Sequence, residues 1–314
     1  MKSFLRSAFI GVLSASSVFS APLEVRQGVS GFTDIDILQF ALTLEHLENV
    51  FYKGAFSRFT ENHFRQAGFD SRLFNQLRFI AQDEENHVVF LTQALSAAGV
   101  IPVSACEYNF PYTDVHSFLA LASVLEGVGT SAYLGGARIL TNKDILTQAG
   151  AILVSEGLHQ SVLRNSLNLI SSAKVTGTPI NPNAIFSLAA SFIVRCPQQN
   201  VALPFRAFPT LTPTQAGPHA ISSRANFRIG RNVNFGRGGA LFLTFVSGLD
   251  IISVVVERAD LLFAVNIPSV ISGQSYVFLT NSEARGSIAD NIIIAGPAII
   301  EVTPNAARIN LSIL

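Results

Sequence analysis

Apolar side chains recur every three or four residues in the first part of the chain, the spacing that places them on one face of a helix. This pattern predicts long helices over about residues 33–59, 71–99, 114–140 and 142–171, and a short fifth helix over about 183–195. Polar capping residues and glycine or proline breaks mark the ends of these segments. We therefore expect a bundle of four helices with a fifth, shorter one.

Beyond residue 196 the pattern changes. Five prolines fall between residues 197 and 218, which predicts a linker without regular structure. Short apolar runs separated by turn residues then predict strands. The strand candidates cover residues 240–246, 251–256, 276–280, 291–294 and 298–302. The chain is thus predicted to be multidomain, with a helical bundle over 31–196 and a small antiparallel β-sandwich-like domain over 219–314.

Six residues break the apolar faces of the four long helices with groups that bind metals. Each helix carries one glutamate in the middle of its apolar face, and two of these glutamates are followed three positions later by a histidine. The six residues are Glu45, Glu84, His87, Glu126, Glu156 and His159. No lysine or arginine lies on those faces, and an unpaired buried carboxylate costs several kcal/mol. A pair of divalent cations would neutralise the four acids.

Two tyrosines repeat with the same offset. Tyr52 follows Glu45 by seven residues, and Tyr133 follows Glu126 by seven residues. The repeat suggests two helical hairpins packed about a local two-fold axis. Both phenols are candidates to hydrogen-bond a carboxylate on a neighbouring helix, although they would equally suit a core with satisfied hydroxyls. Glu48 is a candidate for a further oxygen ligand, but it lies about 60° from the line of Glu45 and is therefore expected at the surface.

Three glycines fall inside the predicted helices beside these ligands. Gly127, Gly129 and Gly157 each weaken a helix by about 1 kcal/mol relative to alanine. They would either allow close approach of neighbouring helices or open space for a small molecule near the metals. The sequence does not separate these alternatives.

These motifs resemble the ferritin-like superfamily over about residues 31–172. The segments that carry the resemblance are LEHLENVFY at 44–52, DEENH at 83–87, LEG at 125–127 and SEGLH at 155–159. More narrowly, the chain is similar to exported fungal ferritin-like domain proteins, which are related to fungal stress-response and plant desiccation-related proteins. The resemblance implies that the six matching positions bind two iron or manganese ions, and that these ions react with dioxygen or peroxide.

Composition and the N-terminus bear on location and partners. Charged residues make up 13% of the 314 residues and the formal net charge is zero, so no basic surface for nucleic acid is expected. Lys2, Arg6 and the apolar stretch 8–19 predict an export signal over residues 1–20, with a membrane anchor as the alternative. No later segment is expected to span a membrane. The mature protein is therefore predicted to be secreted, extracellular or at the cell surface.

Two cysteines fit an oxidising compartment. Cys106 and Cys196 are predicted to form one disulfide that ties the crossover between the helical hairpins to the end of the helical half. The alternative is a pair of buried thiols.

Three functions are consistent with these features. The leading hypothesis is a stress-related, secreted protein whose two metal ions react with dioxygen or peroxide. In the second, the protein is not an enzyme: the metal site stabilises the bundle, and the β domain attaches to cell-wall polymers or mediates self-association. In the third, the bundle oxidises an organic substrate, which would require a cavity beside the metals.

Overall fold

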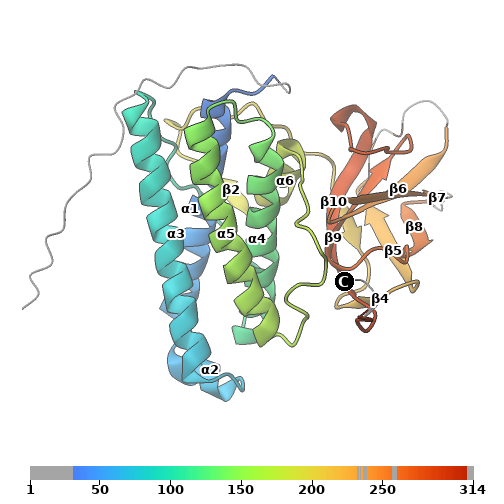
Figure 1. The fold of residues 1–314 in the computed structure, drawn as a ribbon, viewed down its shortest axis with the longest axis horizontal. Helices are drawn as coiled ribbons and strands as arrows, with labels where there is room; N and C mark the ends of the chain where they lie inside the picture. Colours follow the sequence, from blue (N-terminus) through green and yellow to red (C-terminus); the bar gives the residue numbers. More distant parts are fainter. Residues whose placement is uncertain (1–30, 232, 234, 236–238, 257–259, 310–314) are drawn as a thin grey trace, which may run out of the picture.

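The computed structural model describes residues 31–231, 233, 235, 239–256 and 260–309, so the predicted export signal lies outside the described part of the chain. Figure 1 shows a helical half followed by a strand-rich half, with the short helix α6 (Pro182–Ala190) between them. This arrangement confirms the predicted fold class, a helical bundle followed by a β-rich domain with antiparallel sheets.

The long helices begin where the sequence predicts. The remaining helices are α1 (Asp34–Arg58), α2 (Glu61–Gln66), α3 (Ser71–Ala97), α4 (Val115–Ala137) and α5 (Lys143–Ser166). Thr33, Asp70, Asp114 and Asn142 cap the long helices with their side chains, satisfying backbone N–H groups that have no partner inside the helix. The short helix α2 was not predicted.

Two helices end earlier than expected. Helix α5 stops five residues short of the predicted end because Asn168 adopts a left-handed backbone conformation (φ 58°) and the Leu169 N–H bonds back to the carbonyl of Arg164. Helix α6 ends before strand β2 (Ile193–Arg195), which pairs with strand β1 (Glu107–Tyr108) of the crossover. Pairing with a distant strand therefore replaces the predicted last turn of the helix.

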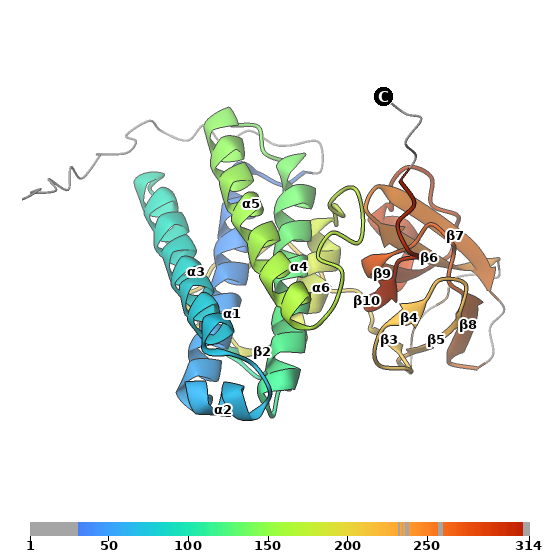
Figure 2. The ribbon, with the colours of Figure 1, turned by 60° about the horizontal axis from the view of Figure 1, so that its bottom comes forward.

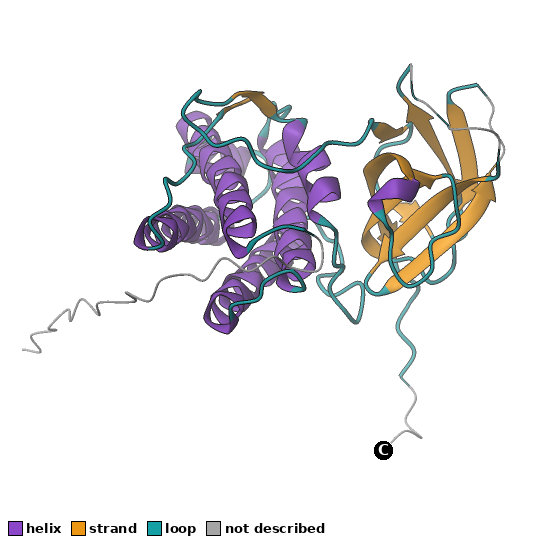
Figure 3. Cartoon of the chain, turned by 90° about the horizontal axis from the view of Figure 1, so that it is seen from above, coloured by secondary structure: helices purple, strands orange, loops and turns teal. Residues whose placement is uncertain are grey.

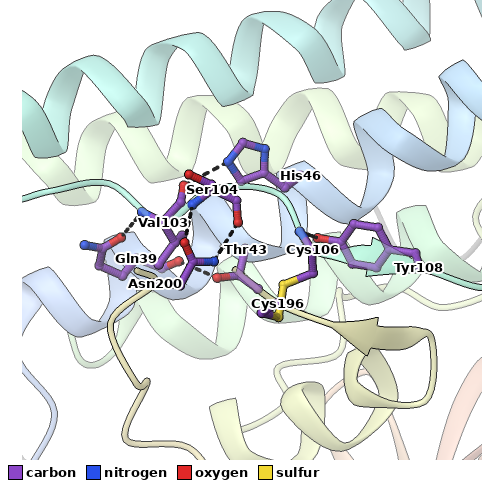
Figure 4. Close-up of a disulfide and its surroundings, with 9 residues drawn as sticks. All are labelled: Gln39, Thr43, His46, Val103, Ser104, Cys106, Tyr108, Cys196 and Asn200. Carbon is purple, nitrogen blue, oxygen red and sulfur yellow. Dashed lines mark hydrogen bonds between the residues drawn. A yellow bond between two sulfur atoms is a disulfide. The ribbon is translucent and has the colours of Figure 1, made fainter. Parts of the chain in front are cut away.

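The four long helices form two pairs, α1 with α3 and α4 with α5. Figure 3 shows the bundle from above, beside the strand-rich half. The crossover between the pairs runs along α1 and is fixed there (Figure 4). The side chain of Gln39 accepts a hydrogen bond from the Val103 N–H at 2.9 Å, and Nε2 of His46 lies 3.0 Å from the Val103 carbonyl oxygen. The predicted disulfide between Cys106 and Cys196 is present and joins the crossover to β2.

The strand-rich half consists of two sheets. Its strands are β3 (Leu211–Pro213), β4 (His219–Ala220), β5 (Arg224–Ile229), β6 (Leu241–Ser247), β7 (Asp250–Val256), β8 (Leu262–Asn266), β9 (Gly273–Thr280) and β10 (Ile293–Thr303). The larger sheet has the order β4-β10-β9-β6-β7 and the smaller one β3-β5-β8. Only β4 and β10 pair in parallel among the described strands.

Several details of the strand prediction were wrong. Strand β3 lies inside the predicted linker, where Pro213 is tolerated because β3 is an edge strand. The candidates 291–294 and 298–302 are one strand, β10, whose register shifts at Gly296 and Pro297. Strands β5 and β8 were missed.

The five-stranded sheet is buried on both faces. Tyr276 and Phe278 of β9 belong to the hydrophobic core of the helical bundle, whereas the alternating Val277 and Leu279 pack against the smaller sheet. A strand covered on both sides carries an unbroken apolar run rather than strict alternation. Figure 2 shows the same sheet beside α4 and α6 from a second direction.

Polar contacts also join the sheet to the bundle. The hydroxyl of Tyr276 donates to Oγ of Ser131 on α4 at 2.8 Å. The amide nitrogen of Gln274 donates to the Val124 carbonyl at 3.1 Å. Arg164 of α5, which is 3% exposed, makes a two-pronged ion pair with Glu301 at 2.7 and 2.8 Å. The two halves of the chain thus share a specific interface.

Helix α4 is long and apolar enough, by length and composition, to cross a membrane, with a mean hydropathy of 1.3. In the structure, 61% of that window is buried inside the protein. The buried Glu126 lies near the middle of the helix. These features are those of the core helix of a bundle.

Candidate metal centre

The structure brings the six predicted ligands together in the middle of the bundle. Helices α1 and α4 contribute one glutamate each, and α3 and α5 each contribute a glutamate with the histidine one turn later. The four glutamates are 0% exposed and His159 is 5% exposed, while the His87 side chain is 12% exposed. The residues are Glu45 of α1, Glu84 and His87 of α3, Glu126 of α4, and Glu156 and His159 of α5.

The donor atoms form two overlapping groups. One group joins Glu45, Glu84, His87 and Glu156, and the other joins Glu84, Glu126, Glu156 and His159. Within each group one atom from every residue lies within 4.8 Å of all the others. Each group has one histidine, and Glu84 and Glu156 are common to both. The arrangement is compatible with a site for two metal ions, with Glu84 and Glu156 as shared ligands.

Nδ1 of His87 is hydrogen-bonded to Glu45 and Glu84, but the atoms around His159 do not satisfy one another. Nδ1 of His159 lies 2.9 Å from Oε1 of Glu84 and 3.2 Å from Oε2 of Glu126. Nevertheless these three atoms, together with both carboxylate oxygens of Glu156, have no hydrogen-bond partner with acceptable geometry and are buried. Buried polar atoms without partners are costly, and here they converge on common points. The donor set therefore fits metal ions.

Two tyrosines each hold one oxygen of a glutamate that belongs to only one of the two groups. The hydroxyl of Tyr52 on α1 donates to Oε1 of Glu126 on α4, and the hydroxyl of Tyr133 on α4 donates to Oε1 of Glu45 on α1. Burial, followed by the nearby carboxylates, raises the pKa of both phenols well above the usual value of 10.0. The phenols therefore remain hydrogen-bond donors, and the second oxygen of each glutamate is directed toward the histidines.

The charges of the cluster are strongly coupled. Burial, with the charges of Glu126 and Glu45, raises the pKa of Glu84 to about 7. Burial alone would lower the pKa of both histidines, but the nearby carboxylates outweigh it and raise the pKa of His87 to about 10 and of His159 to about 11. Without metals, protons therefore neutralise the acids. Two divalent cations supply the four positive charges that four ionised carboxylates require.

One residue that contacts the cluster was not predicted. Oδ2 of Asp83 lies 3.2 Å from Nε2 of His159, while Nδ1 of that ring faces the carboxylates. Asp83 directly precedes Glu84 and lies about 100° from it around α3, so it is outside the apolar stripe by which the ligands were found. Its contact holds the orientation of the His159 ring.

Glu48 is a correction to the prediction. It was expected at the surface, yet it is 4% exposed, because α1 is buried around most of its circumference. Burial and the charges of Glu84, Glu126 and Glu45 raise the pKa of Glu48 well above 4.5.

The structure also explains why a glycine occupies position 129. A Cβ atom there would lie 2.2 Å from Oε2 of Glu156 and 3.3 Å from Oε1 of Glu48.

The other two glycines differ from Gly129. At Gly127 a Cβ atom would lie 2.2 Å from Nε2 of Gln160 and 2.4 Å from Oε1 of Gln274, so this glycine permits the close contact between α4 and the sheet. At Gly157 a Cβ atom would meet nothing within 4 Å. Of the three, Gly129 is the one whose missing side chain leaves room beside the carboxylates.

Comparisons with known proteins agree with this geometry. Residues 33–169, which contain all six ligands, match a family model described as "Ferritin-like domain". Protein rds1 of Schizosaccharomyces pombe (strain 972 / ATCC 24843) is 26% identical over 260 residues, which are 81% of this chain and 61% of that protein. The chain thus spans less than two thirds of the length of this curated relative.

A solved structure shows a weaker similarity. The crystal structure of a conserved hypothetical protein, rv2844, from Mycobacterium tuberculosis matches with a TM-score of 0.37 and 18% sequence identity. The match covers 45% of this chain and 94% of the other. A similarity of this strength has no bearing on the function.

Proposed function

We propose that this chain, which belongs to the ferritin-like superfamily through its helical domain, is a secreted protein that holds two iron or manganese ions in its bundle and reacts with dioxygen or peroxide under stress. The observation that supports this most is the convergence of buried donor atoms from four helices, five of them without hydrogen-bond partners. The disulfide supports export, since such bonds persist in oxidising compartments.

The choice of metal follows from the donor set. Each group of ligands contains three carboxylates and one histidine. Carboxylates suit iron and manganese, and imidazole suits iron equally well. Structural zinc sites are mostly built from cysteine and histidine. We therefore favour iron or manganese over zinc.

Some residues of the chain would bind the metals, and others would control the surroundings of the metals. The ions, when bound, would supply the electrons that reduce the oxidant. Glu84 and Glu156 would contribute to holding both ions, and His87 and His159 would each help to hold one of them. Tyr52 and Tyr133 would hold the carboxylates of Glu126 and Glu45 in place, and the apolar layers around them would exclude water.

Anaerobic loading tests this proposal. The metal-free protein is incubated with ferrous or manganous ions, and dioxygen or hydrogen peroxide is added while the absorption spectrum is recorded. We expect oxidation of the bound metal with consumption of one of the two oxidants. Glu84→Gln should abolish the reaction, whereas Glu85→Gln, a change at a side chain that is 55% exposed and pairs with Lys53, should not.

A non-enzymatic role remains the second candidate, and exposed apolar side chains support it. Phe79 on α3 is 70% exposed, and Val154 and Leu158 on α5 are each 64% exposed. Exposed apolar side chains serve self-association or attachment to another surface where they form a contiguous patch. A protein that binds two metal ions but consumes neither dioxygen nor peroxide in the loading experiment would belong to this class.

A further inference from the structure

The candidate metal centre has two unlike sides. On the side of α3 and α5, the Asp83 side chain is 48% exposed and the His87 side chain 12% exposed, so the centre lies close to the surface there. On the side of α1 and α4, helix α6 and strand β10 cover the bundle, and an apolar pocket lies beneath them.

The pocket has a volume of about 90 Å³ and a nearly continuous apolar wall. Helices α1 and α4 form its inner wall, and α6 and the strand β10 close it from outside. The wall includes Leu44, Leu47, Leu125, Val128, Leu188 and Ile299. The β domain thus completes a cavity of the helical domain.

The pocket reaches the centre through Gly129 and Glu48, which both line it. A Cβ atom at Gly129 would fall 2.2 Å from Oε2 of Glu156, a carboxylate shared by both groups of ligands. The carboxyl of Glu48 is also close to that position, at 3.3 Å. The missing side chain of Gly129 therefore leaves the carboxylates of Glu156 and Glu48 as the boundary between the pocket and the centre.

Size and polarity identify the kind of molecule that fits. Pockets for typical organic ligands measure about 300–1,000 Å³, and an apolar cavity of about 150 Å³ admits benzene or xenon. The pocket is smaller than either, at about 90 Å³. Peroxide would leave its hydroxyl groups unpaired against such a wall, whereas dioxygen has no hydrogen-bond donors to satisfy.

We propose that this pocket binds dioxygen and admits it to the metal centre past Gly129. The inference rests on the proposed function and deepens it, because it names dioxygen rather than peroxide as the oxidant that enters from this side. It also gives the β domain a role, since Ile299 of β10 forms part of the wall.

Xenon binding tests the pocket without any metal. Crystals of the full-length mature protein are pressurised with xenon, an apolar atom that occupies dry apolar cavities. We expect a xenon atom between Val128 and Leu188. Absence of xenon there overturns the proposal, as does xenon found only in the separate apolar cavity of about 40 Å³ that Tyr133 lines.

A variant that fills the pocket tests whether dioxygen reaches the metal centre through it. Ala189 of α6 is 4% exposed and lines the pocket, and it is not one of the candidate ligands. Ala189→Leu should slow ferrous oxidation by limiting dioxygen about tenfold, and should leave oxidation by peroxide unchanged. Ala190→Leu is the matched control, since Ala190 is on the same helix but does not line the pocket. Equal slowing with both oxidants, or no slowing with dioxygen, contradicts the proposal.

Metal content, measured by mass spectrometry on the same samples, separates the two possible failures. Absence of bound metal in the wild-type protein would contradict the proposed function. A full complement of metal without xenon in the pocket would contradict only the dioxygen site. Because xenon is located in unmodified protein, the result does not depend on whether the Ala189→Leu variant folds.

Discussion

Asp83 holds the ring of His159 from outside the metal centre, with 3.2 Å between Oδ2 and Nε2. The contact fixes which nitrogen of the ring faces the carboxylates. Groups that orient a metal-binding histidine in this way typically contribute about 10–100-fold to metal affinity. We therefore expect Asp83→Asn to weaken metal binding by about that factor, measured by calorimetric titration with manganous ions. An affinity equal to that of the wild-type protein would show that Asp83 has no positioning role.

Substitution of a ligand that both groups share should remove more metal than substitution of a ligand that belongs to one group. Glu156 belongs to both groups of donor atoms, whereas Glu126 belongs to one. Glu156→Gln should therefore lose both ions, and Glu126→Gln should keep about one ion per chain, because the group around His87 remains complete. Elemental analysis of the reconstituted variants measures this. Equal metal content in the two variants would contradict the shared role of Glu156.

The metal-free protein should become less stable as the pH rises. Against the effect of burial, carboxylates raise the pKa of His87 from 6.5 to about 10 and of His159 to about 11 in the folded chain. The folded protein then keeps protons that the unfolded chain releases, so this stabilisation is complete below pH 6.5 and is lost as the pH rises through about 10. Burial raises the pKa of Glu84 to about 7, so the folded protein loses further stability as the pH rises from 4.5 through about 7.

Thermal unfolding in the presence of a chelator tests this dependence. We expect the melting temperature of the metal-free protein to fall between pH 6 and pH 10 by about several degrees. The stabilisation by added metal should grow over the same range, because bound metal displaces protons from the ligands. A melting temperature that rises with pH in the metal-free protein would show that the histidines are not charged partners of the carboxylates.

The interface between the two halves depends on a buried hydroxyl. Tyr276 is 1% exposed and donates to Ser131 of α4 at 2.8 Å. Tyr276→Phe removes this donor and should lower the free energy of unfolding by about 1 kcal/mol. Chemical denaturation measures the change. A double variant with Ser131→Ala should be less destabilised than the sum of the single changes, and strict additivity would show that the two groups do not interact.

The disulfide should stabilise the folded protein. It closes a loop with a sequence separation of 90 residues, and the chain-entropy relation gives a contribution of about 4 kcal/mol for a loop of that length. Replacement of Cys106 and Cys196 together by serine should therefore lower the free energy of unfolding by a few kcal/mol. An unchanged denaturation midpoint would contradict this contribution.

The sequence predicts the helical half of the molecule well, because each carboxylate interrupts an apolar face of recognisable period. Glu45 and Glu156 were found in this way, and the offset of seven residues singled out Tyr133. Glu48 was placed incorrectly and Asp83 was not singled out, since their surroundings depend on how neighbouring helices cover α1 and α3 rather than on the period of their own helix.

The strand-rich half was predicted less completely. The apolar runs of β6, β7 and β9 were recognisable, but β3 and β8 are short and take their conformation from pairing with β5. Nothing in the local sequence indicates that Tyr276 faces the bundle, or that Ile299 closes a pocket against α1 and α4. Such contacts arise from the packing of two domains, which periodicity alone does not describe.

Native mass spectrometry of the protein reconstituted with ferrous or manganous ions tests the central claim most directly. The account predicts about two metal ions per chain for the wild-type protein and their loss in the Glu156→Gln variant. A reconstituted, folded wild-type protein that carries no metal ions would contradict it.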